Sequence, residues 1–206
     1  MKRITTELSQ RDKKFGALIA RRPLCPIGRT LSSESHFEAL VSSVISQQLA
    51  VKAAESIHAR LVLLSKGIVT PKKIFALDED ALRGIGISGA KVKTIKGLAE
   101  AELTKKIPIN RIHEIENDDE IFEKLTSLWG IGPWTVDMFM IFQLGRLDIW
   151  PIGDLGVRRG WELTYKLTEE IDPKVMLLKG EKFRPYRSVI AWYCWQAIHE
   201  ARDNKK

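Results

Sequence analysis

The sequence predicts an all-α fold, and three observations carry that prediction. Apolar residues recur at helical spacing along most of the 206 residues. No run of alternating apolar and polar residues is bounded by hairpin-turn signals, so strands are expected to be scarce. Several segments also open with residues typical of a helix N-terminus, including Ser35 and Glu38, which have the spacing of a capping box.

The first expected helices follow one another with short breaks. One lies in residues 12–21, whose apolar residues share a face. The next pattern starts at Ser35 and keeps helical spacing to residue 64. The polar pair Gln47-Gln48 interrupts the apolar face of this pattern, so we expect two helices that meet there.

Three further helices are expected towards the C-terminus. Thr70-Pro71 begins a short one, because proline is favoured in a first helical turn. Residues 116–128 start with Asn and Asp and then place apolar residues on one face. Residues 186–202, which follow Pro185, have the pattern of one long helix.

The chain is basic: 33 Lys and Arg residues stand against 26 Asp and Glu residues, which gives a net charge of +7. This balance favours a polyanionic partner such as a nucleic acid, although solvated lysine faces also produce it. No apolar run approaches the ~18 residues of a membrane span, and the first residues lack the apolar stretch of a signal peptide. We therefore expect an intracellular protein, cytoplasmic in a bacterium or archaeon and nuclear in a eukaryote.

The two cysteines, Cys25 and Cys194, are too few for a four-cysteine iron–sulfur cluster. Neither belongs to a CxxC pair, which also excludes a cysteine-ligated zinc site. We expect both to be reduced, buried thiols.

A short motif occurs twice. "LRGIGISGAK" at residues 82–91 and "LWGIGPWTV" at residues 128–136 both contain Leu-x-Gly-Ile-Gly between helical segments. Each predicts two helices joined by a tight turn, for which glycine supplies a permissive backbone. In the first copy the exit from the turn is longer, so we expect a plain turn there, with Lys91 and Lys93 near a nucleic acid backbone.

The second copy has features suited to binding a phosphate. Gly130 and Gly132 allow backbone angles closed to other residues and carry no side chain that would hold a partner away. Pro133 begins a helical turn, so the next backbone N–H groups lack helical partners and suit a phosphate oxygen. Such a contact would position a nucleic acid without reading its sequence.

Asp154 follows Pro151-Ile152-Gly153 and opens another helical pattern. One interpretation is an N-cap aspartate, which is a common role. The other is functional, because a carboxylate near a phosphate-binding turn suits a reaction that develops positive charge on a sugar. The two interpretations are compatible.

These motifs together resemble the helix–hairpin–helix DNA glycosylase superfamily. Four segments carry the resemblance in order: "VISQQLAVKAAESIHARL", "LWGIGPWTVDMFMIF", "DIWPIGDLGVRRG" and "FRPYRSVIAWYCW". Within the superfamily they are most similar to the 3-methyladenine DNA glycosylase II (alkyladenine glycosylase) branch, including its short yeast-type members. The resemblance extends from about Ser35 to Trp195.

The resemblance implies a two-lobed fold with the active site in the cleft between the lobes. A central six-helix lobe over residues 35–144 would carry the hairpin. Residues 1–34 and 145–206 would form the second lobe.

The resemblance also implies a monofunctional glycosylase of base excision repair. Such an enzyme flips an alkylated purine (3-methyladenine or 7-methylguanine) out of the duplex, hydrolyses its N-glycosidic bond and leaves an abasic site. Asp154 would be catalytic and stabilise an oxocarbenium-like sugar, whereas the position of Asp148 better fits capping or a salt bridge. Trp134 stands where lyase members carry a lysine, so no Schiff base and no lyase activity are expected.

The same resemblance assigns further roles residue by residue. Core packing remains the alternative for the two pocket tryptophans, and a buried amide pair at a helix junction remains the alternative for the plug. The roles are a base pocket of Trp134, Met138 and Trp195; DNA binding by Gly130, Ile131, Gly132 and Thr135; a duplex plug at Gln48 and Leu49; and main-chain carbonyls of Thr126, Leu128 and Ile131 for a monovalent cation.

The expected partner is double-stranded DNA containing alkylated bases, bound by a monomer. No cofactor is expected to be required, and a Na⁺ or K⁺ ion at the hairpin would be structural. The alternative function is a non-catalytic helix–hairpin–helix DNA-binding module. Asp154 separates the two functions, because a pure binder needs no carboxylate near the backbone that it grips.

Overall fold

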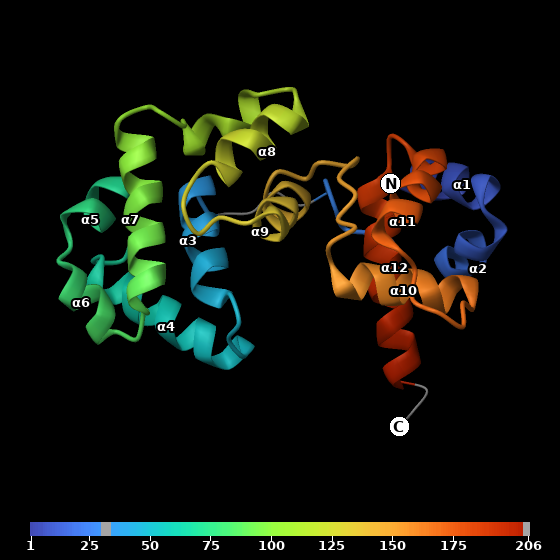
Figure 1. The fold of residues 1–206 in the computed structure, drawn as a ribbon, viewed down its shortest axis with the longest axis horizontal. Helices are drawn as coiled ribbons and strands as arrows, with labels where there is room; N and C mark the ends of the chain where they lie inside the picture. The colour runs from blue at the N-terminus through green and yellow to red at the C-terminus, as the bar shows by residue number, and fades with distance from the viewer. Residues whose placement is uncertain (30–33, 204–206) are drawn as a thin grey trace. The chain divides into compact units, whose positions relative to one another are not determined.

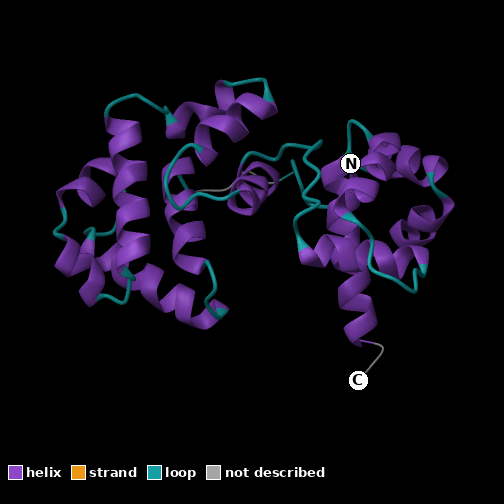
Figure 2. Ribbon diagram, in the orientation of Figure 1, coloured by secondary structure: helices purple, strands orange, loops and turns teal. Residues whose placement is uncertain are grey.

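The computed structural model describes residues 1–29 and 34–203, and every regular element in that part of the chain is helical (Figures 1 and 2). The all-α prediction is therefore confirmed. The chain divides into two compact units. We call Ser32–Phe139 the central unit, and Met1–Leu31 with Met140–Lys206 the terminal unit.

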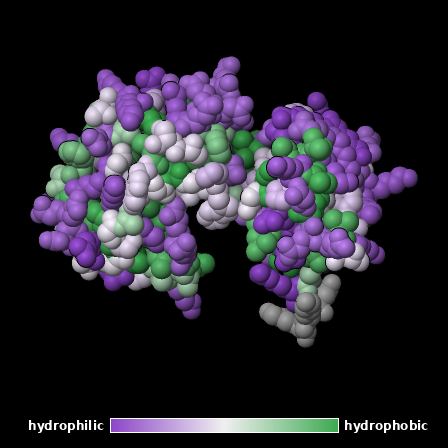
Figure 3. All heavy atoms as spheres, viewed as in Figure 1, coloured by the Kyte–Doolittle hydropathy of each residue, from purple (hydrophilic) through white to green (hydrophobic). Residues whose placement is uncertain are grey.

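Figure 3 shows hydrophilic side chains over much of the surface of each unit, with hydrophobic ones scattered between them. Among the helices of the described ranges, none is long and apolar enough to cross a membrane.

The central unit is built around α7, which packs against α3 and α5. The helices of this unit are α3 (His36–Ser46), α4 (Val51–Leu64), α5 (Pro71–Ala76), α6 (Glu79–Gly84), α7 (Gly89–Leu103), the 3₁₀ turn η1 (Ile109–Glu114), α8 (Asp118–Thr126) and α9 (Pro133–Met138).

Three of these helices begin where the sequence predicts. Ser35 Oγ accepts from the Glu38 N–H at the start of α3, and Thr70 Oγ1 accepts from an N–H at the start of α5. Asn117 caps α8 in the same way. Each cap satisfies an N–H group that lacks a partner within its helix. The break at Gln47-Gln48 is also confirmed, because α3 ends and α4 begins on either side of it.

The terminal unit combines both ends of the chain. Its core includes Phe15, Trp161 and Phe183, whose side chains are almost wholly buried and in mutual aromatic contact. Its elements are α1 (Lys2–Arg11), α2 (Lys13–Arg21), most of the π-helical turn η2 (Phe139–Gln143), α10 (Leu155–Tyr165), α11 (Pro173–Gly180), the 3₁₀ turn η3 (Glu181–Phe183) and α12 (Arg187–Asp203).

Helices α10 and α12 pack closely against each other. A Cβ atom added to Gly160 of α10 would lie 1.9 Å from the carbonyl oxygen of Cys194 in α12, so only glycine fits there. Cys25 and Cys194 are both free and buried, as predicted. Burial raises the pKa of the Cys25 thiol to about 11, which makes it a poor nucleophile at neutral pH.

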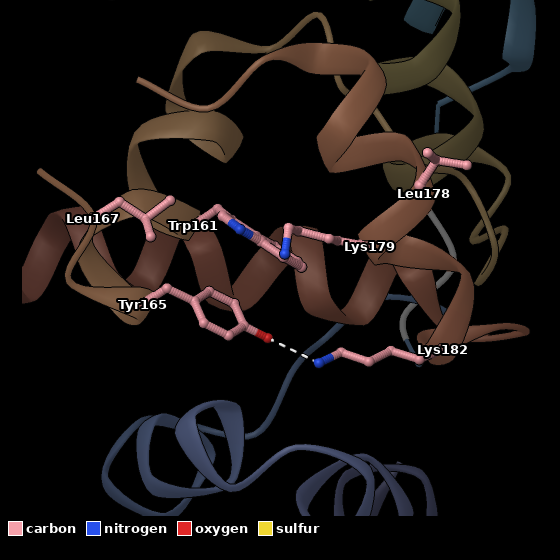
Figure 4. A pocket seen from close by; sticks show the side chains of 6 residues that line it. All are labelled: Trp161, Tyr165, Leu167, Leu178, Lys179 and Lys182. Carbon is pink, nitrogen blue, oxygen red and sulfur yellow. Dashed lines mark hydrogen bonds between the residues drawn. The ribbon is translucent and has the colours of Figure 1, made fainter. Parts of the chain in front are cut away.

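A polar cluster joins α2, α10 and η3 at the edge of a hollow in the terminal unit (Figure 4). Tyr165 Oη and Lys182 Nζ each donate to Asp12 Oδ2 at 2.6 Å. The other oxygen of Asp12 caps α2 through the N–H groups of Lys14 and Phe15. This carboxylate therefore links three elements of the terminal unit.

Candidate functional site

The turn between α8 and α9 requires glycine at position 130. Gly130 has φ +81°, in the left-handed region that side chains disfavour. A Cβ atom there would lie 2.1 Å from Thr94 Oγ1 of α7. The turn therefore packs directly against α7 at Gly130.

Gly132 has a different role from the one the sequence suggested. Its backbone angles, φ −92° and ψ 166°, are open to any residue, so the prediction of a special conformation holds for Gly130 and is wrong for Gly132. No atom lies within 4 Å of a Cβ added to Gly132. This glycine is the N-cap of α9 and supplies no side chain to the first-turn N–H groups, while Pro133 has no N–H to offer. Because Gly132 has no side chain, the space at the N-terminal end of α9 stays open.

The side chains of Ile131 and Thr135 face inward, with 4% and 3% of their surface exposed. Thr135 Oγ1 accepts from Gln47 Nε2 at 3.1 Å, and the same amide donates to the Gly130 carbonyl at 3.4 Å. Neither side chain is therefore available to an outside partner. Sequence reasoning missed Gln47 as a partner of the turn, because its polarity was interpreted only as an interruption of α3.

Two tryptophans on this turn are exposed. Trp134 keeps 49% of its surface exposed, which contradicts the core-packing alternative for this residue. Met138, one turn later, is half-buried. Trp129 is 54% exposed, and Lys93 Nζ lies 4.3 Å from the centre of its ring, in cation–π contact.

The plug turn, which we define as residues 47–50, lies between α3 and α4. Gln48 is exposed and has φ +56°, an uncommon conformation for a residue other than glycine. Leu49 is 40% exposed although it is apolar. The alternative of a buried amide pair is therefore wrong for Gln48, whereas the Gln47 side chain is partly buried and hydrogen-bonded.

Lys91 does not face outward as the sequence suggested. Its Nζ donates to the carbonyls of Ile45 at 2.7 Å and Gln47 at 2.8 Å, at the C-terminal end of α3. Burial lowers the pKa of Lys91. Because its ammonium is committed to internal carbonyls, we withdraw the expectation that it meets a nucleic acid backbone.

Asp154 is the N-cap of α10, as one of its two interpretations predicted. Its Oδ1 accepts from the Val157 N–H at 2.7 Å and from Trp195 Nε1 at 3.0 Å. A side chain 41 residues away in the sequence therefore orients the same carboxylate oxygen as the helix does. The cap does not exclude a catalytic role.

Gly156 allows this contact. A Cβ atom added to Gly156 would lie 2.9 Å from Trp195 Cδ1 and 3.0 Å from Asp154 Oδ1. Any larger residue would separate the indole from the carboxylate. Sequence reasoning missed Gly156, because in "DLGVRRG" it has the appearance of an ordinary helix residue.

Trp195 is half-buried and forms part of an aromatic wall. Its ring centre lies 5.5 Å from that of Phe142, which is 52% exposed. Both line a hollow that also includes Trp192 and Gly156. Core packing is observed instead for Tyr193, which is wholly buried and donates to the Pro23 carbonyl at 3.2 Å.

Cys194, the residue before Trp195, lies close to Asp154. Burial and then the charge of Asp154 raise the pKa of its thiol well above the usual range. A thiol in this state is neutral and unreactive.

Asp148, the alternative carboxylate, is held in a salt-bridge network. Its Oδ1 accepts from Arg187 Nε at 2.8 Å, and its Oδ2 accepts from Arg184 and from Arg187 Nη2 at 2.8 and 3.0 Å. The Arg187 side chain is 10% exposed, so this ion pair is largely shielded from water. The predicted salt-bridge role of Asp148 is confirmed.

Of the carbonyls predicted to hold a cation, that of Thr126 belongs to the last residue of α8, and those of Leu128 and Ile131 lie in the turn that follows. The last carbonyls of a helix lack partners within it, and carbonyl oxygens suit a hard cation. The Leu128 carbonyl accepts from the Ile131 N–H at 3.1 Å, which leaves it one lone pair. In residues 1–29 and 34–203 no three His, Cys, Asp or Glu side chains are grouped as metal ligands.

Comparison with known protein families gives one family. The model of the HhH-GPD superfamily of base excision DNA repair proteins matches residues 41–185. That range contains the plug turn, the hairpin and Asp154.

Two curated relatives come from Schizosaccharomyces pombe. DNA-3-methyladenine glycosylase 1 is 36% identical over 171 residues, which cover 82% of this chain and 75% of the relative. Alkylbase DNA glycosidase-like protein mag2 is 30% identical over 198 residues, which cover 95% and 92%.

Two solved structures are similar over nearly their whole length. The S. pombe 3-methyladenine DNA glycosylase Mag1 in complex with abasic DNA has a TM-score of 0.79 and 32% identity, covering 94% of this chain and 95% of that one. The DNA-3-methyladenine glycosidase from Bacillus halodurans has a TM-score of 0.87 and 29% identity, covering 97% and 91%.

Proposed function

This chain belongs to the HhH-GPD superfamily of base excision DNA repair proteins, and we propose that it is a monofunctional DNA glycosylase acting on alkylated purines. It hydrolyses the N-glycosidic bond of 3-methyladenine and 7-methylguanine in double-stranded DNA after base flipping. The product is an abasic site. The names of its curated relatives support this substrate class.

The observation that carries the proposal is the carboxylate of Asp154, oriented by two N–H donors. A fixed negative charge stabilises the oxocarbenium character that a deoxyribose develops as its base departs. A methylated purine such as 3-methyladenine is already cationic and leaves without a strong general acid. One oriented carboxylate is therefore enough to supply the main catalytic effect.

Trp134 supports both the substrate and the absence of lyase chemistry. Its exposed indole face attracts a cationic base, an effect of about 2 kcal/mol when water is excluded. An indole cannot form the Schiff base of a lyase, so the reaction ends at the abasic site. The roles of Met138 and Trp195 as base-pocket residues stay predictions.

DNA is held through its backbone in this proposal. The backbones of Gly130, Ile131, Gly132 and Thr135 bind phosphates near the lesion, and carbonyls of Thr126, Leu128 and Ile131 hold a Na⁺ or K⁺ ion that offsets phosphate charge. Gln48 and Leu49 fill the space left by the flipped nucleotide. The exposure of both plug residues supports this role. The protein acts as a monomer.

Asp154 and Trp134 belong to different compact units. The expectation that the two lobes share one active site stays a prediction.

The test of the function is to incubate the native protein with methylated duplex DNA and to analyse the released bases. We expect free 3-methyladenine and 7-methylguanine, and strands that break only after alkali treatment. Breakage without alkali would show lyase activity and contradict the role of Trp134. Tight DNA binding without any released base would leave the non-catalytic binding module as the function.

A further inference from the structure

Three segments of the central unit meet at Gln47. This residue is the C-cap of α3. Its side-chain amide donates to Thr135 Oγ1 and to the Gly130 carbonyl, both on the hairpin. Its own carbonyl accepts from Lys91 Nζ in the first turn of α7. The backbone of Gln47 is therefore held by α7, and its side chain is held by the hairpin.

Lys91 holds more than one carbonyl at this point. Its ammonium also binds the Ile45 carbonyl at 2.7 Å, one of the last-turn carbonyls of α3 that lack a helical partner. A cation is favoured at the C-terminal end of a helix by the helix dipole. Lys91 thus fixes the direction in which the chain leaves α3.

The conformation of Gln48 and Leu49 depends on the direction in which the chain leaves α3. Gln48 adopts φ +56°, and the Leu49 N–H closes the turn on the Ser46 carbonyl at 3.2 Å. A non-glycine residue keeps a left-handed conformation only where its surroundings impose it. Here the imposed contacts are those made to Gln47, and the residues they present are exposed and partly apolar.

From these contacts we infer that Lys91 and Gln47 are positioning residues that tie the plug turn to the hairpin. The inference rests on the proposed function and concerns base flipping. A phosphate bound at the hairpin fixes Gly130 and Thr135, and Gln47 transmits that position to the plug turn. Gln48 and Leu49 then meet the duplex at a set distance from the gripped phosphates. Binding energy from the DNA backbone is thereby used to hold a nucleotide out of the stack.

The chain offers a matched control on the same helix. Lys96, also on α7, donates through Nζ to the carbonyls of Phe75 and Leu77 at the C-terminal end of α5. It therefore does for α5 what Lys91 does for α3. No contact of Lys96 reaches the hairpin or the plug turn in the described chain. Lys91→Met and Lys96→Met each remove one such cap, and only the first loosens the plug turn.

The experiment measures single-turnover release of 7-methylguanine from two substrates. In one duplex the lesion is paired with cytosine, and in the other the same strand carries it in an unpaired bubble. Lys91→Met and Gln47→Leu are expected to slow release from the paired duplex by about 10- to 100-fold, the cost of a small misplacement of a positioned group. Release from the bubble should fall by about threefold or less, because an unpaired nucleotide needs little help to flip. Lys96→Met should keep the native ratio of the two rates.

Thr135→Val removes the same hydrogen bond from the hairpin side. Its effect on the paired duplex should not add to that of Gln47→Leu, because both variants break one connection. This pair also decides the matter if Lys91→Met does not fold.

Equal losses on both substrates, or native rates for Lys91→Met and Gln47→Leu, would overturn the coupling and leave the glycosylase intact. A native protein that releases no base from either substrate would overturn the proposed function itself.

Discussion

The two Leu-x-Gly-Ile-Gly segments share their letters and differ in their geometry. In the first, α6 continues through Gly84, and the left-handed residue is the second glycine, Gly86, with φ +100°. In the second, α8 ends four residues before the motif's first glycine, Gly130, which is itself the left-handed residue. The left-handed residue therefore lies two motif positions earlier in the second copy than in the first.

The helices that follow the two segments also begin differently. Ser88 caps α7, and its Oγ accepts from the Lys91 N–H, whereas Gly132 caps α9 with no side chain. The lysine of the first hairpin is also turned inward, onto carbonyls of α3. The first hairpin therefore caps its following helix with a side chain, and the second leaves the start of its following helix without a side-chain cap. The two copies of the motif therefore differ in geometry, and we propose that only the second binds a ligand.

The largest expected effect is that of Gly130→Ala. The new Cβ atom would meet Thr94 Oγ1 in a backbone conformation unfavourable to alanine, so we expect a loss of about 2–4 kcal/mol in the free energy of unfolding. Gly84→Ala, in the first hairpin, meets nothing within 4 Å and should gain about 0.5 kcal/mol. Denaturant titration of both variants measures the contrast. Similar stabilities for the two would show that the shift between the copies is not real.

Gly132→Gln should separate binding from stability. Its added atoms enter open space, so the fold should tolerate them, but they would occupy the approach of a phosphate. We expect affinity for undamaged duplex DNA to fall about tenfold, equal to about 1.4 kcal/mol. Gly89→Gln is the matched change at the start of α7, where a Cβ also meets nothing, and it should leave affinity as it is. Unchanged affinity of Gly132→Gln would argue against the second hairpin as the grip.

Ser88→Ala tests whether the first hairpin stabilises the fold without binding DNA. Loss of the cap should cost about 0.5–1 kcal/mol of unfolding free energy, because the start of α7 loses its side-chain acceptor. DNA affinity should stay native, as measured by titration with undamaged duplex. A drop in affinity without a drop in stability would mean that this hairpin also grips DNA.

The smallest effect lies outside both hairpins, in the terminal unit, and depends on pH. Burial alone would raise the pKa of Asp12, but hydrogen bonds from Lys182 and Tyr165 outweigh it and hold the pKa below the ordinary value of 3.8. The stabilisation is therefore fully present above pH 3.8 and is lost as pH falls through the lower pKa of the folded state. Asp12→Asn should be less stable at neutral pH and should lose less stability in acid. Parallel acid-unfolding curves for the variant and the native protein would refute this role.

Much of the fold follows from local chemistry that a sequence displays. Capping residues such as Ser35, Thr70 and Asn117 indicate where helices begin, and Asp154 indicates the start of α10. These signals involve residues three positions apart or fewer, so one sequence is enough to read them. The turn at Gln47-Gln48 was visible for the same reason.

The rest depends on contacts between distant residues. Nothing in the sequence links Gln47 to Thr135, or Trp195 to Asp154, because their partners are set by packing. The difference between the two motif copies is not visible in the sequence for a related reason. Any glycine permits a left-handed backbone angle. In the second copy, the contact of Gly130 with Thr94 determines that this glycine adopts it. The inward orientation of the Lys91 side chain was likewise unpredictable, since a sequence does not distinguish an exposed lysine from one that caps a helix.

We propose that Asp154 turns a DNA-binding protein into a glycosylase. The direct measurement compares the native protein with Asp154→Asn, an isosteric change that keeps an oxygen to accept from Val157 and Trp195. Single-turnover release of 7-methylguanine from a methylated duplex should fall by at least about 100-fold, while affinity for undamaged duplex DNA stays within about twofold. Release by Asp154→Asn at the native rate would contradict the account.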